Sequence, residues 1–252
     1  MPPETLAKLN LFERYVALEQ IGMSPDEHRV GEPERPYKEW APDDYKAVLA
    51  MFNSWPRFEA ADKQMDDMRA GFLAAFAQNL AMNPHADRKG RLLLAADALN
   101  TAGSDIFGPD FPRAELDFIA GGRPSYYGGL RPDGKIQINT LKLDDPTVNG
   151  SAFSGDLSFI ELVVHEATHN VQLFQAKISD GETQDGLLSM RVAETFYEST
   201  AGAKNYNRDL YWLHPFEVQA REFAHSTAKA LQANLPASGA APAHAAKRSI
   251  AP

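Results

Sequence analysis

The chain has 252 residues, no cysteine and a formal net charge of −9, and its length allows one large domain or one domain with an attached smaller unit. The acidic balance argues against binding to nucleic acid or to anionic membranes, because their phosphates would be repelled. Without cysteine there is neither a disulfide framework nor a thiolate metal site, so any metal must be held by His, Asp or Glu. No segment reaches the ~20 apolar residues of a membrane span. We therefore expect a soluble, cytoplasmic protein, although a removed signal peptide would also allow secretion.

The first hundred residues are predicted to form helices. An amphipathic pattern at the start is followed by a connection rich in Pro and charged residues. The expected helices span 4–20, 43–53, 58–82 and 88–102. The last of these has a dense apolar face and is expected to stop at Gly103, because glycine is typical of helix C-termini. We therefore predict a helical N-terminal region over residues 1–110.

The pattern changes near residue 115, where short strands are predicted. The expected strands are ELDFIAGG, SYYGGL and KIQINTLKL. RPDG at 131–134 has the residues of a tight turn between the last two. Within KIQIN, Ile136 and Ile138 alternate with polar residues, as on a half-buried strand. A loop is expected over 144–156, so a small sheet is predicted to precede the next helix.

The segment VVHEATHNVQ, residues 163–172, lies in the middle of this next helix. Ser158 and Glu161 fit a capping box at its start. A wide buried face is expected from its apolar residues, which are Phe159, Ile160, Leu162, Val163, Ala167, Val171 and Phe174. The two histidines of the segment, His165 and His169, are therefore predicted to lie four residues apart on one helix.

Helical geometry places His165 and His169 where both can bind one metal ion. Residues i and i+4 differ by about 40° around the helix axis and lie one turn apart. Glu166 is about 60° from His169 by the same geometry, which is unsuited to binding the ion but within reach of a water on it. Zn²⁺ suits this arrangement, because a catalytic zinc has three protein ligands and an open position. The ion would activate that water and polarise the scissile carbonyl, with Glu166 as the general base.

The third ligand has its best candidate in Glu217. Pro215 suits the first position of a helix, so Glu217 falls in the first turn of that helix. Ala220 and Ala224 follow on nearly the same face. Small side chains there would let this helix, expected to end near residue 232, approach the histidine helix closely.

Simpler interpretations of these residues stay open. Glu194, in a helix expected over 186–203, is the alternative third ligand because it is closer in sequence to His169. Glu217 could instead only complement the positive N-terminal end of its helix. The histidines could form an ordinary polar patch, but a chance HExxH in a chain with 7 histidines is expected on the order of once in a hundred such chains. The metal site is therefore the favoured interpretation.

HExxH followed by a helical glutamate resembles the gluzincin group of zinc metallopeptidases. The order of KIQIN, a loop, HEATH and EVQAREFA is similar to that of the small ImmA/IrrE-type metallopeptidases, over about residues 115–228. The zinc ligands that the resemblance implies are His165, His169 and Glu217. It implies Glu166 as the catalytic base. It also implies that the strand near 135–140 borders the cleft and pairs with an extended substrate.

Side chains near the motif could support the metal ligands or stabilise an oxyanion. Arg221 stands four positions after Glu217, where these groups often have an acidic or amide residue that supports a histidine. Gln172 extends the motif to HExxHxxQ, which is also similar to other bacterial zincins. Candidates for stabilising an oxyanion are Tyr126, Tyr127 and Tyr211, although tyrosine more often packs in a core.

Together these features predict an α+β protein with a mainly helical zincin-like fold and a small sheet before the HExxH helix. The expected divisions are a helical region at 1–110, a metallopeptidase core at 111–233 and a disordered Ala- and Pro-rich tail at 234–252. The predicted function is zinc-dependent hydrolysis of peptide bonds in a protein or peptide substrate. The alternatives are a non-catalytic zincin-fold module that binds proteins, or a zinc-dependent hydrolase of a non-peptide amide.

Overall fold

The structure is a computed structural model, and its described part is a set of helices with one small sheet. The described residues are 46, 49–50, 52–53, 55, 59–121, 127–131, 133–143, 156–178 and 213–234. Their elements, in chain order, are α4 (Glu59–Met82), α5 (Arg88–Phe107), β1 (Glu115–Ile119), β2 (Gly128–Leu130), β3 (Lys135–Asn139), α6 (Thr140–Leu143), α7 (Asp156–Ile178) and α10 (Pro215–Asn234). The helices predicted over 4–20 and 186–203, and the predicted tail, lie outside the described residues.

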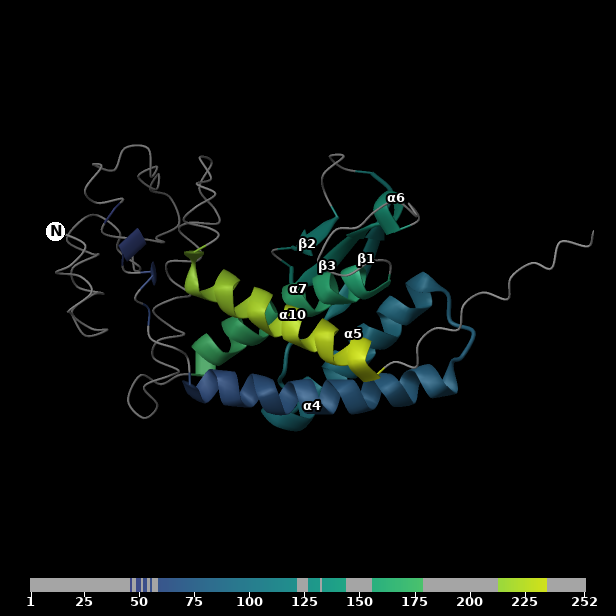
Figure 1. Cartoon of the computed structure of the whole chain (residues 1–252), viewed down its shortest axis with the longest axis horizontal. Coiled ribbons are helices and arrows are strands. Elements are labelled where there is room, and N and C mark those ends of the chain that lie inside the picture. Colours follow the sequence, from purple (N-terminus) through teal and green to yellow (C-terminus); the bar gives the residue numbers. More distant parts are fainter. Residues whose placement is uncertain are drawn as a thin grey trace, which may run out of the picture.

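The predicted α+β class is confirmed, because the described part of the chain is mostly helical and the small sheet precedes the HExxH helix. Helix α7 lies in the middle, where it contacts α5, α10 and strands β2 and β3. Figure 1 shows α4 along one side of the molecule, α10 crossing above it, and the sheet on the other side of α7. The helix that carries the two histidines is therefore surrounded by structure on several sides.

The sheet has three strands in the order β1-β3-β2, with β1 parallel and β2 antiparallel to β3. The predicted tight turn joins β2 to β3: Gly134 N–H donates to Arg131 O at 2.9 Å, and Gly134 has a φ of 81°, which favours glycine. Strand β3 ends at Asn139, and the remaining residues of the predicted strand KIQINTLKL form helix α6.

The expectation that the strand near 135–140 pairs with a substrate is wrong. Strand β3 is the middle strand, so its backbone groups are already bonded to β1 and β2 on either side. Among the described strands, β2 lies at the edge of the sheet on the side that contacts α7. The physical reason for the error is that a single sequence gives the strands but not their lateral order.

Helix α5 runs five residues further than predicted. Asp87 accepts a hydrogen bond from the Gly90 N–H at 2.7 Å and so caps its start, and Gly108, with a φ of 85°, follows its end. Gly103 therefore lies inside the helix and does not stop it. A Cβ at Gly103 would overlap the ring of Phe111, so its lack of a side chain makes room for an aromatic ring.

One hydrophobic core joins α4, α5, the sheet, α7 and α10. Its members include large side chains that are almost fully buried, namely Met65, Met68, Phe72, Phe76, Leu92, Leu99 and Phe159. Burial of each such side chain stabilises the fold by roughly 1.5–3 kcal/mol. Ile136 and Ile138 are fully buried, which confirms their predicted alternation on β3. The core therefore fixes α7 and α10 against one another.

Helix α7 begins at Asp156, two residues before Ser158, so Ser158 lies inside the helix and the predicted capping box is wrong. The predicted apolar face is confirmed, because Ile160, Val163 and Val171 are buried. A capping pattern is short and also occurs by chance within helices, so it predicts a helix start poorly. An apolar stripe over several turns is a more specific signal of a buried helix face.

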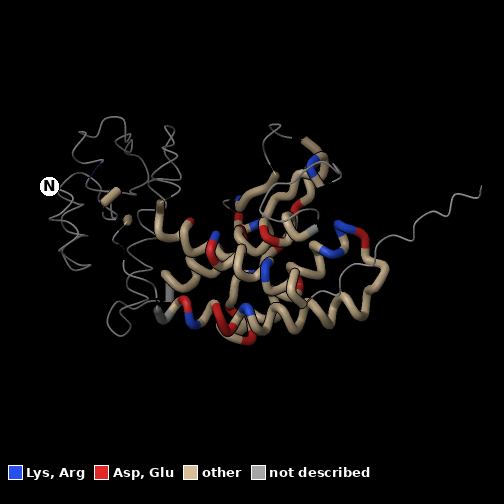
Figure 2. Tube along the Cα trace, viewed as in Figure 1, with Lys and Arg blue, Asp and Glu red and all other residues tan. Residues whose placement is uncertain are grey.

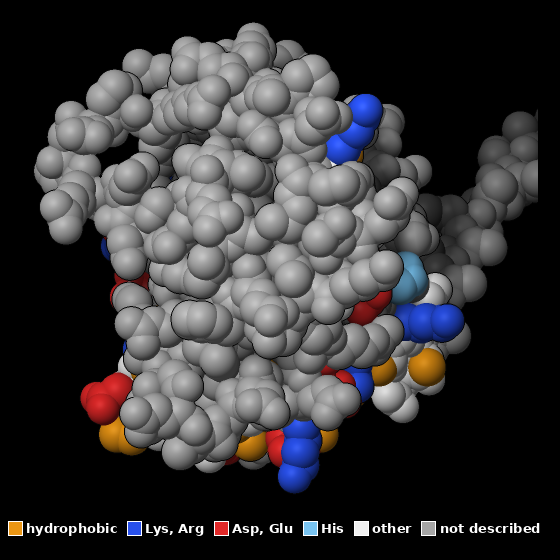
Figure 3. All heavy atoms as spheres, turned by 90° about the vertical axis from the view of Figure 1, so that its left-hand side faces the viewer, with side chains coloured by type: hydrophobic (Ala, Val, Ile, Leu, Met, Phe, Trp, Pro, Cys, Tyr) orange, Lys and Arg blue, Asp and Glu red, His pale blue; other side chains and the backbone are white. Residues whose placement is uncertain are grey.

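Charged residues of both signs are interspersed in the first half of α4, and its second half carries none (Figure 2), so no stripe of one sign follows the helix. On the face drawn in Figure 3, the described side chains in view also mix acidic, basic and hydrophobic types. Among the described residues, no helix has the length and apolar character that crossing a bilayer requires.

Candidate metal centre

Helix α7 presents His165 and His169 on one face, one turn apart. Their Nε2 atoms are 3.2 Å from one another and the planes of the two rings are nearly perpendicular, at 89°. His169 is 1% exposed, whereas His165 is partly exposed. The predicted i, i+4 arrangement is thus present, with one imidazole buried and the other partly exposed.

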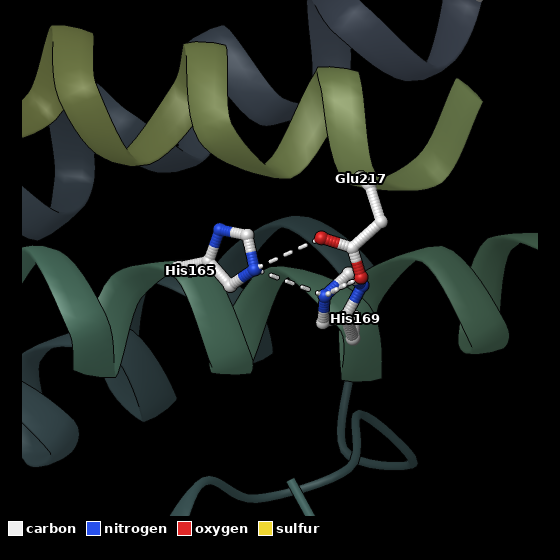
Figure 4. A group of neighbouring side chains, drawn as sticks. All are labelled: His165, His169 and Glu217. Carbon is white, nitrogen blue, oxygen red and sulfur yellow. Dashed lines mark hydrogen bonds and ion pairs between the residues drawn. The ribbon is translucent and has the colours of Figure 1, made fainter. Parts of the chain in front are cut away.

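Helix α10 brings Glu217 to the two histidines. The carboxylate lies 3.4 Å from Nε2 of His165 and 3.3 Å from Nε2 of His169, with a different oxygen facing each ring. Figure 4 shows the three side chains pointing toward one another from the two helices. Glu217 is 1% exposed, and such a buried carboxylate does more than complement the end of its helix. The alternative ligand Glu194 lies outside the described residues.

The start of α10 is built to place Glu217. Pro215 occupies the first helical position, as predicted. His214 caps the helix, because its Nδ1 accepts the Phe216 N–H at 3.1 Å and its carbonyl accepts the Val218 N–H at 3.0 Å. His214 is buried and its ring packs against an aromatic side chain, so its position is structural. It therefore sets where the first turn of α10 begins.

Two small residues let α10 approach α7. Ala220 and Ala224 are 0% and 1% exposed, and the two helices are in close contact. A larger side chain at either position would push the helices apart, because interiors are close-packed. Their burial and the contact between the two helices are what this prediction requires.

The charges at the site depend on one another. Burial opposes ionisation of Glu217, but hydrogen bonds from His165 and His169 outweigh it and hold the pKa of this carboxyl well below its usual range. Burial also opposes protonation of His169, but its contacts with Glu217 outweigh it and raise the pKa of the imidazole above 6.5. A buried carboxylate and a cationic partner thus stabilise each other, and a metal cation would supply the same positive charge.

The donor atoms of the three residues lie close enough together to bind one metal ion. With zinc–nitrogen and zinc–oxygen bonds of about 2.0–2.2 Å, neighbouring ligand atoms of a tetrahedron lie about 3.3–3.6 Å apart. The two nitrogens are 3.2 Å apart, and each faces a different oxygen of Glu217, at 3.4 Å from His165 and 3.3 Å from His169. One donor atom from each of the three residues lies within 4.8 Å of the other two. His165, His169 and Glu217 therefore form a possible metal site. Two imidazoles and one carboxylate suit zinc and related transition metals better than calcium or magnesium.

Glu166 is held by the sheet. The Leu130 N–H, on the edge strand β2, donates to Oε2 of Glu166 at 2.9 Å. Glu166 is partly exposed, and its charge also contributes to the raised pKa of His169. A backbone donor thus orients the carboxylate that follows the first histidine in the chain.

Sequence reasoning missed the partner of His169. Nδ1 of His169 is 2.8 Å from Oε1 of Gln172, which is fully buried. Metal-bound histidines usually have such an oriented partner. Arg221, at the position expected to hold such a partner, instead has its guanidinium 3.8 Å from Glu217. The signal was the spacing itself, since Gln172 follows His169 by three residues and so shares its face of the helix.

The predicted oxyanion candidates and one further histidine add no described contact to the three donors. Tyr127 packs against Phe159 in the core, with ring centroids 6.5 Å apart, and so behaves as a packing residue. Tyr126 and Tyr211 lie outside the described residues. His225 is half exposed and faces Glu161, with Nδ1 3.3 Å from its carboxylate.

Comparisons of the chain with protein-family models, with curated proteins and with solved structures found no match.

Proposed function

We propose that this protein is a zinc-dependent peptidase, with zinc bound by His165, His169 and Glu217. The observation that carries the proposal is the convergence of two imidazole nitrogens and one buried carboxylate from two packed helices. Glu166, next in the chain to the first donor, is proposed as the general base. This arrangement of a donor set and an adjacent carboxylate is typical of HExxH hydrolases.

Bound zinc would supply Lewis-acid polarisation of the scissile carbonyl and a lowered pKa for the attacking water. The chain supplies the base, because the Glu166 carboxylate is oriented by the Leu130 N–H at 2.9 Å. Glu166 takes the proton of the attacking water and then delivers it to the leaving amine. The partial exposure of His165 and Glu166 leaves this side of the site accessible to a substrate, whereas His169 and Glu217 are buried.

The edge strand supports a peptide as the substrate. Strand β2 is at the edge of the described sheet, and its Leu130 contacts Glu166 directly. An extended peptide that added to this edge by backbone hydrogen bonds would lie beside the general base. A non-peptide amide would have no backbone with which to pair in this way.

The test is the Glu166→Gln variant, which keeps the size of the side chain but cannot accept the proton. Zinc-loaded wild type, Glu166→Gln and the control Glu222→Gln would be incubated with a peptide library, and cleavage would be followed by mass spectrometry. Glu222 is exposed on α10. We expect Glu166→Gln to keep its zinc and lose activity by about 10²–10⁴-fold, and Glu222→Gln to match the wild type.

Equal cleavage by wild type and Glu166→Gln would exclude Glu166 as the base. Zinc binding without cleavage of any peptide in a broad library would instead favour a non-catalytic binding module.

A further inference from the structure

A chain of hydrogen bonds leads from His169 to the surface of α4. Nδ1 of His169 lies 2.8 Å from Oε1 of Gln172, and Nε2 of Gln172 donates to Oε1 of Gln219 at 2.7 Å. Nε2 of Gln219 then donates to Oδ1 of Asp62 at 2.7 Å. Gln172 also donates to the backbone carbonyl of Phe216 at 2.9 Å. The series of hydrogen bonds thus connects three helices, α7, α10 and α4.

Every link of this chain has only one possible direction. The Asp62 carboxylate at neutral pH only accepts, so Gln219 must turn its NH₂ group toward it and its oxygen toward Gln172. Gln172 must then present its NH₂ group to Gln219, and the Phe216 carbonyl demands the same orientation.

The oxygen of Gln172 consequently faces His169 and requires a proton on Nδ1. A neutral imidazole with its proton on Nδ1 has its lone pair on Nε2, which is the atom that faces Glu217 and His165. The carboxylate of Asp62 on α4 thus fixes the orientation of both amides. The amides in turn determine which nitrogen of His169 on α7 carries the proton.

We propose that Gln172 and Gln219 are positioning residues, which hold His169 as the Nδ1–H tautomer with Nε2 free for the metal, and that Asp62 anchors them. This inference rests on the proposed metal site. The residues fit the role because Gln172 is fully buried and Gln219 nearly so, whereas Asp62 is partly exposed. A flipped Gln172 would admit the wrong tautomer. The Phe216 carbonyl opposes this flip directly, and Asp62 opposes it by fixing the orientation of Gln219.

Asp62 and Gln219 also line a surface cavity between α4 and α10. Asp62, at the outer end of the hydrogen-bond series, is therefore accessible to solvent, while Gln172, at the inner end, is buried beside His169. An aspartate in this position keeps its charge partly solvated, which avoids the cost of a buried unpaired carboxylate.

The experiment compares substitutions of the two buried glutamines of α7. Gln172→Met keeps the approximate shape but removes the acceptor from His169. Gln175→Met is the matched control, because Gln175 is also fully buried and bonded to α4, through Gln64 at 2.9 Å, but is not bonded to His169. Zinc affinity is measured by competition with a chelator, and thermal melting records the stability of each variant.

We expect Gln172→Met to weaken zinc binding by about 10–100-fold and Gln175→Met to leave it near the wild-type value, even if both lower the melting temperature. Asp62→Ala should weaken zinc binding by a smaller factor. Asp62→Asn should bind zinc with nearly the wild-type affinity, because an amide oxygen still accepts a hydrogen bond from Gln219. Equal zinc affinity in Gln172→Met and Gln175→Met would overturn the proposal.

A second measurement reads the tautomer directly. The ¹⁵N resonances of His169 are recorded in zinc-loaded protein, and also in metal-free protein at a pH where this imidazole is neutral. We expect the proton on Nδ1 in both samples, with slow exchange that is lost in Gln172→Met. A proton on Nε2 in the metal-free protein would refute the assignment of the positioning role. Because the metal-free sample needs no zinc, failure of the proposed zinc site and failure of this inference give different results.

Discussion

The carboxylate of Glu217 lies 3.3 Å from Nε2 of His169, although the two residues belong to different helices, α10 and α7. Both side chains are almost fully buried. A buried carboxylate needs a cationic partner or strong hydrogen bonds, because burial strongly disfavours an isolated charge. The pair therefore marks a place where the protein stabilises charge in its interior, as a metal site requires.

Loss of one histidine should abolish tight zinc binding. His169→Ala removes one of three protein donors, so we expect the metal content to fall from about one zinc per chain to a small fraction of that. Zinc should also raise the melting temperature of the wild type but not of the variant, because only a bound ligand stabilises the folded state. Metal analysis after gel filtration and melting curves with added zinc measure both effects.

The control for this experiment is His225→Ala, which removes a half-exposed histidine that pairs with Glu161 and not with the three donors. Full zinc occupancy in His169→Ala would contradict the proposed site.

The identity of the third ligand can be tested by two parallel substitutions. Glu217→Ala should weaken zinc binding strongly, because it removes a donor and leaves His165 and His169 without their acidic partner. Glu194→Ala should leave zinc bound. Titration of each metal-free variant with zinc, followed by calorimetry, gives the affinities. The reverse order of affinities would transfer the ligand role to Glu194.

The metal-free protein should be most stable between about pH 4.5 and 6.5, the ordinary pKa values of the two groups concerned. The raised pKa of His169 gives stabilisation that is complete below 6.5 and is lost as the pH rises through the folded-state value. The lowered pKa of Glu217 gives stabilisation that is present above 4.5 and is lost as the pH falls through the folded-state value. Urea unfolding of chelator-treated protein across this range measures the effect.

With zinc bound, stability should increase rather than fall as the pH rises above 6.5. The reason is that zinc binds neutral histidines, so its affinity rises as they lose protons. The variant Glu217→Gln, which lacks the charge, should show a flatter pH dependence in the metal-free state. Metal-free stability that increases steadily above pH 6.5 would be inconsistent with the His169–Glu217 pair.

Gly103→Ala should destabilise the protein, although alanine is the better helix former by about 1 kcal/mol. The added methyl group would overlap the ring of Phe111, which stacks on Phe107 with centroids 5.4 Å apart and also contacts Phe174. Overpacking of this kind typically costs about 1–3 kcal/mol. The midpoint of urea unfolding measures the net change.

A double-mutant cycle provides the control for this prediction. Phe111→Leu removes the ring that the methyl group would meet, so Gly103→Ala should cost less in that background. If Gly103→Ala raises the stability of the otherwise unchanged chain, the close packing at this position is not a constraint.

Local geometry allowed much of the site to be predicted from the sequence. The four-residue spacing of His165 and His169 fixes their relation on any regular helix, and Pro215 fixes the first turn that holds Glu217. The apolar stripe of α7 and the alternation on β3 likewise follow from the periods of helix and strand. Each of these features depends on residues within a few positions of one another.

Only the tertiary structure decided the features that join distant segments. It placed Glu217 against the two histidines, put β3 in the middle of the sheet and β2 at its edge, and turned Gly103 from an expected helix stop into a packing position. It also brought Asp62 and Gln219 into line with Gln172. Spacing along the chain made Glu217 a candidate but does not fix any of these contacts, because they depend on how whole helices and strands pack around a shared core.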